Sequence, residues 1–276
     1  MNIRYAKLLF ITAVAAACNG EPGTTEPPPP PPPPPPPAVQ LRDITIPNLP
    51  SPFYHFEYDT AGRVGVASFA SGFLVYDVVY DGGRISEMRT NTIVNRDVLK
   101  YAYDAAGRVS DVRYIDSSGL TYTTLSFSYD AQQVRQIERA RRVSAGFVID
   151  KTMSFSYHAD GNLAELTIHR PPIDGRQEET TTVDRFEGYD DDVNVDGFGL
   201  IHDEFFDHLV LLPGVELQKG NPARHIHTGD GTNFRIDYRY TYDAKNRPLT
   251  KVGAATFLNG SDAGRTFQTN SVFSYY

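Results

Sequence analysis

The sequence has 276 residues with 26 basic and 34 acidic side chains, and its formal net charge of −8 without a basic block excludes a typical nucleic-acid partner. Its single cysteine excludes an internal disulfide. The 17 tyrosines and 16 phenylalanines favour strands, and the length suits one all-β domain.

Residues 1–17 are predicted to be a secretory signal peptide. Arg4 and Lys7 supply its positive charge, and the apolar run that follows is too short to span a membrane, which takes about 20 residues. The chain's only cysteine comes next, so residues 15–18 (AAAC) resemble the bacterial lipobox, although that motif usually has Leu or Val at its first position. The resemblance implies lipidation of Cys18; the alternative is an ordinary cleaved signal peptide beside an incidental cysteine.

Residues 18–38 are expected to form a lipidated, proline-rich tether. Pro27–Pro37 is an unbroken run of 11 prolines. Such a run adopts the polyproline II conformation at about 3.1 Å per residue, so it reaches roughly 34 Å. We favour a spacer that lifts the remaining residues, 39–276, off a membrane surface. The alternative is a ligand for proline-binding modules.

A short motif recurs through the sequence between residues 56 and 250. Residues 58–64 (YDTAGRV) return almost unchanged at 103–109 (YDAAGRV). The Asp can accept a hydrogen bond from the backbone two residues on, and the Gly permits the positive φ that closes a short hairpin. Residues 80–85 (YDGGRI) carry another copy, weaker copies begin at Tyr129, Tyr157 and Tyr242, and Tyr189-Asp190 continues the series.

Apolar and polar residues alternate before these tyrosines. Leu125, Phe127 and Tyr129, for example, alternate with Ser126 and Ser128. A period of two indicates a strand with one apolar face. Each repeat is therefore predicted to be a strand, a tight turn and a return strand. The whole domain is expected to be an all-β antiparallel meander of about 14–16 strands, curled into an open sheet or a barrel.

The Tyr-Asp-x-x-Gly-Arg-Val motif resembles the YD repeat of Rhs and wall-associated proteins, whose repeats form β-sheets wrapped into shells. With the lipobox, the tether and the segments 189–191 (YDD) and 221–222 (NP), the chain resembles a family of Bacteroidetes lipoproteins, a domain of unknown function with a porin-like fold. This resemblance covers residues 40–276 and implies strands curled towards a barrel, but no function. The residues before Tyr276 are too polar for the last strand of an outer-membrane barrel, so we expect the apolar face to be internal.

One segment fits a calcium-binding loop. Asp192, Asn194 and Asp196 precede Gly197, and Asp203 follows after five residues, in the pattern D-x-N-x-D-G-x5-D. Calcium takes six to eight oxygen ligands, and the Gly permits the sharp turn that makes the first three converge. These four oxygen-bearing residues are the predicted metal ligands, with calcium as the cofactor. The alternative is an acidic turn between strands that binds no metal.

Other patterns that could support chemistry are weak. His225 and His227 share one face of a strand, but a zinc site needs a third or fourth ligand, and we favour ordinary strand histidines. Carboxylate pairs such as Glu178-Glu179 could serve a glycosidase only at a defined separation. The sequence contains no G-x-S-x-G elbow, P-loop or dinucleotide fingerprint. We therefore assign no catalytic residue and expect no enzyme.

The sequence accordingly predicts a lipoprotein of the bacterial cell envelope, anchored to the outer membrane through its N-terminal lipid. We expect a non-enzymatic binding or structural module whose partner is a glycan or another envelope protein. The tyrosine rows could stack on sugars, although filling a core is the favoured interpretation. The alternatives are a carboxylate-based glycan hydrolase and a calcium-stabilised adhesion module.

Overall fold

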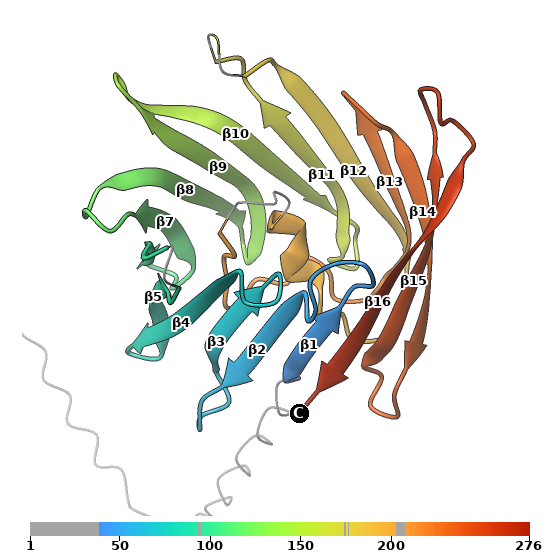
Figure 1. The fold of residues 1–276 in the computed structure, drawn as a ribbon, viewed down its shortest axis with the longest axis horizontal. Helices are drawn as coiled ribbons and strands as arrows, with labels where there is room; N and C mark the ends of the chain where they lie inside the picture. Colours follow the sequence, from blue (N-terminus) through green and yellow to red (C-terminus); the bar gives the residue numbers. More distant parts are fainter. Residues whose placement is uncertain (1–38, 93–94, 174, 176, 203–207) are drawn as a thin grey trace, which may run out of the picture. The chain divides into compact units, whose positions relative to one another are not determined.

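The computed structural model describes residues 39–276, apart from 93–94, 174, 176 and 203–207. Cys18, the predicted signal peptide and the proline run therefore lie outside the described residues. Sixteen strands form one closed antiparallel barrel, in which each strand pairs with its sequence neighbours and β1 closes the ring on β16 (Figure 1). The predicted antiparallel meander is confirmed, and its form is a closed barrel rather than an open sheet.

The strands run in chain order around the barrel. The only helix among the described residues is a short 3-10 turn, η1 (Gly197–Ile201), between β12 and β13. No helix in this part of the chain is long and apolar enough to cross a membrane. The strand bounds are β1 (Leu41–Thr45), β2 (Tyr54–Tyr58), β3 (Val64–Phe69), β4 (Leu74–Asp81), β5 (Arg84–Thr90), β6 (Val98–Tyr103), β7 (Val109–Ile115), β8 (Thr121–Asp130), β9 (Gln133–Val143), β10 (Gly146–Tyr157), β11 (Leu163–Arg170), β12 (Thr180–Tyr189), β13 (Pro222–Gly229), β14 (Phe234–Tyr242), β15 (Pro248–Phe257) and β16 (Thr266–Tyr275).

The Asp of each full repeat organises the turn between an even-numbered strand and the next odd-numbered one. In the turn from β2 to β3, Asp59 Oδ1 accepts hydrogen bonds from the backbone amides of Ala61 and Arg63, both at 2.9 Å. Gly62 adopts a φ of +76°, a region that side chains with a Cβ rarely enter. The last full repeat has Asn246 at this place with a φ of +59°, because Asn tolerates the same region.

The tyrosines of the first six repeats bind the preceding hairpin, whereas in the last repeat Tyr240 makes this bond and Tyr242 donates to the Asp190 side chain. Tyr80 Oη donates to the backbone oxygen of Val64 at 3.0 Å, and Tyr103 Oη donates to that of Ile85 at 2.7 Å. The accepting residue is the first or second of the preceding odd-numbered strand, so the bond ties each hairpin to the one before it. The same bond joins Tyr58 to Leu41, Tyr129 to Val109, Tyr157 to Val134, Tyr189 to Leu163, and Tyr275 to Pro248.

The arginine of the repeat links the turn to the next tyrosine. Arg63 forms an ion pair with Asp59 at 2.7 Å, and its guanidinium lies 4.2 Å from the ring centroid of Tyr80. Arg108 repeats the arrangement over Tyr129 at 4.6 Å. A cation above an aromatic face contributes about 0.5–1 kcal/mol at an exposed site. The Tyr, Asp, Gly and Arg of the motif therefore each have a local structural task.

The inner face of the barrel is mostly apolar and the outer face is largely polar. On β8, Leu125 and Phe127 pack against the core, whereas Ser126 and Ser128 are exposed. Membrane-spanning barrels carry an apolar band on the outside. The described strands place most of their apolar residues inside instead, as the sequence predicts.

We predict that Tyr103→Phe destabilises the barrel by about 1 kcal/mol, because it deprives the backbone oxygen of Ile85 of its hydrogen bond. Urea unfolding of the full-length chain measures the change. Tyr276→Phe is the matched control, because that side chain is 58% exposed and water can replace its bond, so a change within about 0.5 kcal/mol is expected. Equal losses in the two variants would contradict the interlocking role of the repeat tyrosines.

Candidate functional site

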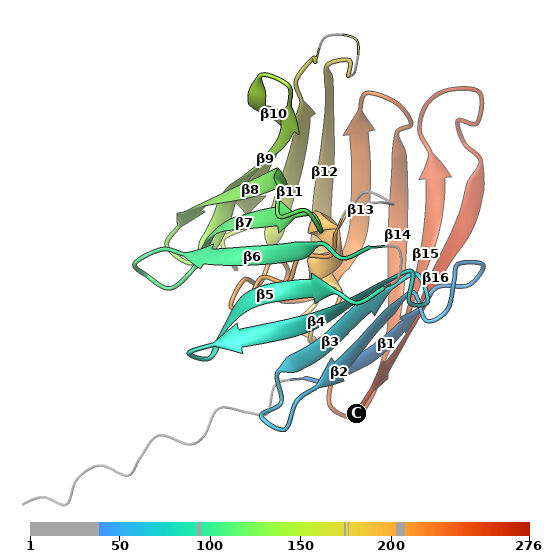
Figure 2. The same cartoon turned by 60° about the vertical axis from the view of Figure 1, so that its left-hand side comes forward.

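Described residues of the connection between β12 and β13 lie inside the barrel. Figure 1 and Figure 2 both place η1 within the ring of strands. We call residues 190–202 and 208–221, the described part of this connection, the inner segment. Its Leu209 and Val210 pack in one core cluster with β1–β7, and its Leu217 packs in a second cluster with β9–β12. The barrel interior is therefore a packed core rather than an open channel.

The two ends of the inner segment are joined to each other and to the wall. Asn221, which is 2% exposed, donates its backbone N–H to Asp190 Oδ1 at 2.8 Å. Asn162, in the turn after β10, accepts hydrogen bonds from the amides of Lys219 and Gly220. A Cβ on Gly220 would lie 2.1 Å from the backbone oxygen of Asp190, so only glycine fits there.

A buried histidine joins the middle of the inner segment to the wall. His208 Nδ1 lies 2.8 Å from Tyr76 Oη, and its Nε2 lies 2.8 Å from Tyr122 Oη and 3.0 Å from Asp97 Oδ2. Burial raises the pKa of Asp97, but hydrogen bonds from His208 and Tyr122 outweigh it, so this pKa lies below its ordinary value. The anchor therefore depends on an ionised carboxylate in the connection between β5 and β6.

Three of the predicted calcium ligands lie at the start of the inner segment, and the side chains of two of them have partners in the protein. Asn194 Oδ1 accepts the Gly197 amide at 2.8 Å, and Asp196 Oδ2 forms an ion pair with Lys251 Nζ at 2.9 Å. The Asp192 amide donates to Asp190 Oδ1 at 3.2 Å. The fourth ligand, Asp203, is outside the described residues, so the calcium site stays a prediction.

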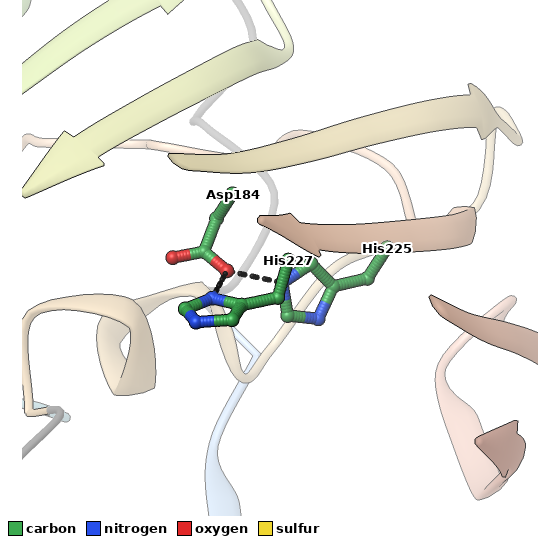
Figure 3. Close-up of side chains that lie close together, drawn as sticks. All are labelled: Asp184, His225 and His227. Atoms are coloured by element: carbon green, nitrogen blue, oxygen red, sulfur yellow. Dashed lines mark hydrogen bonds and ion pairs between the residues drawn. The ribbon is translucent and has the colours of Figure 1, made fainter. Parts of the chain in front are cut away.

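The two histidines of the strand pattern meet a carboxylate that the sequence did not reveal. His225 Nε2 and His227 Nδ1 both contact Asp184 Oδ1, at 2.6 and 2.7 Å (Figure 3). The ligand atoms of the three residues lie within 4.8 Å of one another. The pairing of β12 with β13 produces this arrangement, because Asp184 stands opposite His227 and Phe186 opposite His225.

Aromatic rings fix both imidazoles. Phe186 stacks on His225 with ring centroids 4.8 Å apart, and Phe234 stacks on His227 at the same distance. Burial raises the pKa of Asp184, but hydrogen bonds from the two histidines outweigh it, so the pKa of Asp184 lies below its ordinary value. The cluster therefore presents a carboxylate and two oriented imidazoles on the inner face of the barrel.

A cavity of about 250 Å³ adjoins this cluster, between the wall and the inner segment. His225, Phe186, Tyr238 and Lys251 are among its lining residues. Lys251 Nζ lies 4.6 Å from the ring centroid of Tyr238. His225 thus forms part of both the three-residue cluster and the cavity wall.

A larger cavity of about 420 Å³ lies between β1–β5 and the inner segment. It reaches the end of the barrel that carries the repeat turns, because Gly62 and Arg63 line it there. Most of the remaining lining is apolar and comes from both the wall and the inner segment: Leu41, Phe56, Val64, Ile85, Val195, Phe198, Leu211, Leu212 and Pro213.

No protein-family model matches the sequence, and no curated protein matches it at a significant level. Solved structures do match the fold. A porin-like protein from Bacteroides uniformis has a TM-score of 0.56 and 14% identity, covering 81% of this chain and 89% of its own. A porin-like protein from Bacteroides vulgatus has a TM-score of 0.57 and 13% identity, covering 86% and 99%. At this identity the likeness shows the fold alone, and it confirms the expected porin-like architecture.

The Asp97 anchor predicts a specific dependence of stability on pH. The pKa of Asp97 is lower in the folded protein than in the unfolded chain, where it is about 3.9. The ionised carboxylate therefore stabilises the fold fully at pH values above the unfolded pKa. This stabilisation is lost as the pH falls through the pKa of the folded protein. Asp97→Asn should cost about 1.5–3 kcal/mol at pH 7, since it removes hydrogen bonds to a charged group.

Urea unfolding of the full-length chain at pH 7, 5, 4 and 3 measures this effect. The gap between the wild type and Asp97→Asn should narrow below pH 4, because the wild type loses the charge that the variant lacks at every pH. Asp262→Asn is the control, since that carboxylate lies in an exposed loop and pairs with the exposed Arg265. A gap that stays constant from pH 7 to pH 3 would contradict the ionised anchor.

Proposed function

We propose that this chain is a lipid-anchored protein of the bacterial envelope whose barrel is a non-enzymatic binding module for a small apolar molecule. The observation that carries the proposal is the 420 Å³ cavity between the wall and the inner segment. Ligand pockets typically measure about 300–1,000 Å³ and have mostly apolar linings with a few polar groups. The cavity has this size and this lining.

The position of the cavity supports ligand entry from the end of the barrel that carries the repeat turns. Tyr58, Tyr80 and Arg63 belong to the repeats and line the cavity, whereas Leu211 and Leu212 of the inner segment form its opposite wall. The hydroxyls of Tyr58 and Tyr80 are bound to backbone oxygens. Because these polar groups are already paired, the cavity favours an apolar chain or ring over a glycan.

The cavity linings also support a non-enzymatic role. Among the described residues, no carboxylate lines the 420 Å³ cavity. The 250 Å³ cavity has one, Asp196, which is paired with Lys251. A carboxylate-based glycosidase needs two acidic groups facing each other across its substrate. Neither lining supplies that pair.

The anchor rests on the sequence before the barrel. An apolar leader ends at Cys18, and the proline run leads to the first described residue, Val39. Acyl chains contribute about 0.8 kcal/mol per buried methylene, so several chains on one cysteine hold a protein firmly to a membrane. A polar outer face suits a barrel that stands in water beside the membrane.

Lipidation is tested by growing a bacterial host that expresses the full-length chain with an alkyne-bearing palmitate. The wild type should incorporate the label and sediment with membranes. Cys18→Ser should lose the label and be released into the soluble fraction, because the acylated thiol is absent. Ser51→Ala, a small substitution beyond the tether, is the control and should keep both properties. An unlabelled wild type would overturn the anchor.

Ligand binding is tested with a fluorescent long-chain fatty acid titrated into the full-length chain. We expect saturable binding, and Leu212→Trp should weaken it at least tenfold because the indole fills the cavity. Leu120→Trp is the matched control, since Leu120 is 42% exposed in the turn at the other end of the barrel. Absence of saturable binding, or equal binding by the two variants, would count against the proposed ligand class.

A further inference from the structure

Asp184, His225 and His227 form a compact set of potential metal ligands. One carboxylate oxygen and two imidazole nitrogens converge on the inner face of β12 and β13, with the nitrogens 2.6 and 2.7 Å from the oxygen (Figure 3). Their side chains are 12%, 15% and 20% exposed, respectively. The three side chains are thus mostly buried but remain partly accessible to solvent.

The chemistry of these three groups suits a divalent transition metal. Zinc binds imidazole nitrogen at about 2.0–2.1 Å and carboxylate oxygen at about 2.0–2.2 Å, commonly with two or three such ligands. Neighbouring ligand atoms around a tetrahedral zinc stand roughly 3.4 Å apart on those bond lengths. The distances from His225 Nε2 and His227 Nδ1 to Asp184 Oδ1 need to lengthen by less than about 1 Å to reach that spacing.

The surroundings restrict how the ligands can move. Phe186 and Phe234 each stack on one imidazole at 4.8 Å between centroids, so both ring planes are set before any ion arrives. The ligands also stand on two paired strands rather than on a loop. Ligands held by rigid elements and packed neighbours lose little freedom on binding, which favours affinity.

The simplest alternative is a metal-free cluster in which both histidines donate to one carboxylate. That arrangement satisfies the same three atoms, but it does not use the adjoining 250 Å³ cavity, which His225 helps to line. A zinc ion with three protein ligands keeps a fourth position for water or a small ligand. The cavity supplies space for that fourth ligand.

We propose that Asp184, His225 and His227 bind one divalent ion of the zinc class inside the barrel, with a fourth position open towards the 250 Å³ cavity. The two histidines contribute Nε2 and Nδ1, and Asp184 contributes Oδ1. This site is separate from the apolar cavity of the proposed ligand, so either can exist without the other.

The test is isothermal titration of zinc chloride into the full-length chain after treatment with a chelator and its removal. We expect one ion per chain with a dissociation constant in the micromolar range or lower. His227→Gln and Asp184→Asn should each weaken binding at least tenfold. His169→Gln is the matched control, because His169 is an exposed histidine that also contacts a carboxylate, Glu179, and its loss should leave the affinity unchanged.

Circular dichroism of each variant establishes that the barrel is folded, and His225→Gln replaces Asp184→Asn if that substitution unfolds the chain. Cobalt(II) provides a second readout, because a tetrahedral site of nitrogen and oxygen ligands gives visible absorption bands that the folded variants should lack. Absence of zinc binding by the wild type would overturn the proposal. Binding that survives both His227→Gln and His225→Gln would overturn it equally, since the ion would then lie elsewhere.

Discussion

The hydrogen bond from a tyrosine to the backbone of the preceding hairpin, which recurs around the ring, is the interaction on which the barrel depends. Tyr103 illustrates it, because its hydroxyl meets a carbonyl at the start of β5 while its ring packs inward and Arg84 lies over its face. The Tyr103 side chain therefore packs in the core, links two hairpins through its hydroxyl and makes a cation–π contact with Arg84. Units of this kind recur around the ring of 16 strands, which the pairing of β1 with β16 closes.

Local physics made the barrel wall predictable from sequence. A period of two, an Asp that organises the turn and a Gly or Asn with positive φ each act within a few residues, so the strand order and the inward apolar face follow without knowledge of distant contacts. The sequence did not decide between an open sheet and a closed barrel, because closure depends on the pairing of β1 with β16 at the two ends of the domain. The hydrogen-bond partner of each tyrosine hydroxyl also could not be predicted from the sequence, since it lies in another hairpin.

The interior was harder to predict than the wall. Asp184 was missed as a neighbour of His225 and His227 because the register of β12 on β13 brings them together across a long stretch of intervening chain, most of it inner segment. The alternation of β12 puts Asp184 on the face of Phe186, which was the available signal. The motif around Asp192 was visible in the sequence. Lys251, the partner of Asp196, was not predictable because it lies on β15, far along the chain. The candidate sites of this barrel therefore depend on what the inner segment and the wall create together.

Native-state hydrogen exchange of the full-length chain tests most directly whether the inner segment is a fixed part of the core. The amides of Leu209 and Leu211 donate to the hydroxyls of Tyr76 and Tyr101 on the barrel wall. We predict that both amides exchange as slowly as the strand amides of β4 and β6, because they open only when the barrel opens. Rapid exchange of these two amides beside a protected barrel would contradict the account, since the segment would then leave the interior on its own.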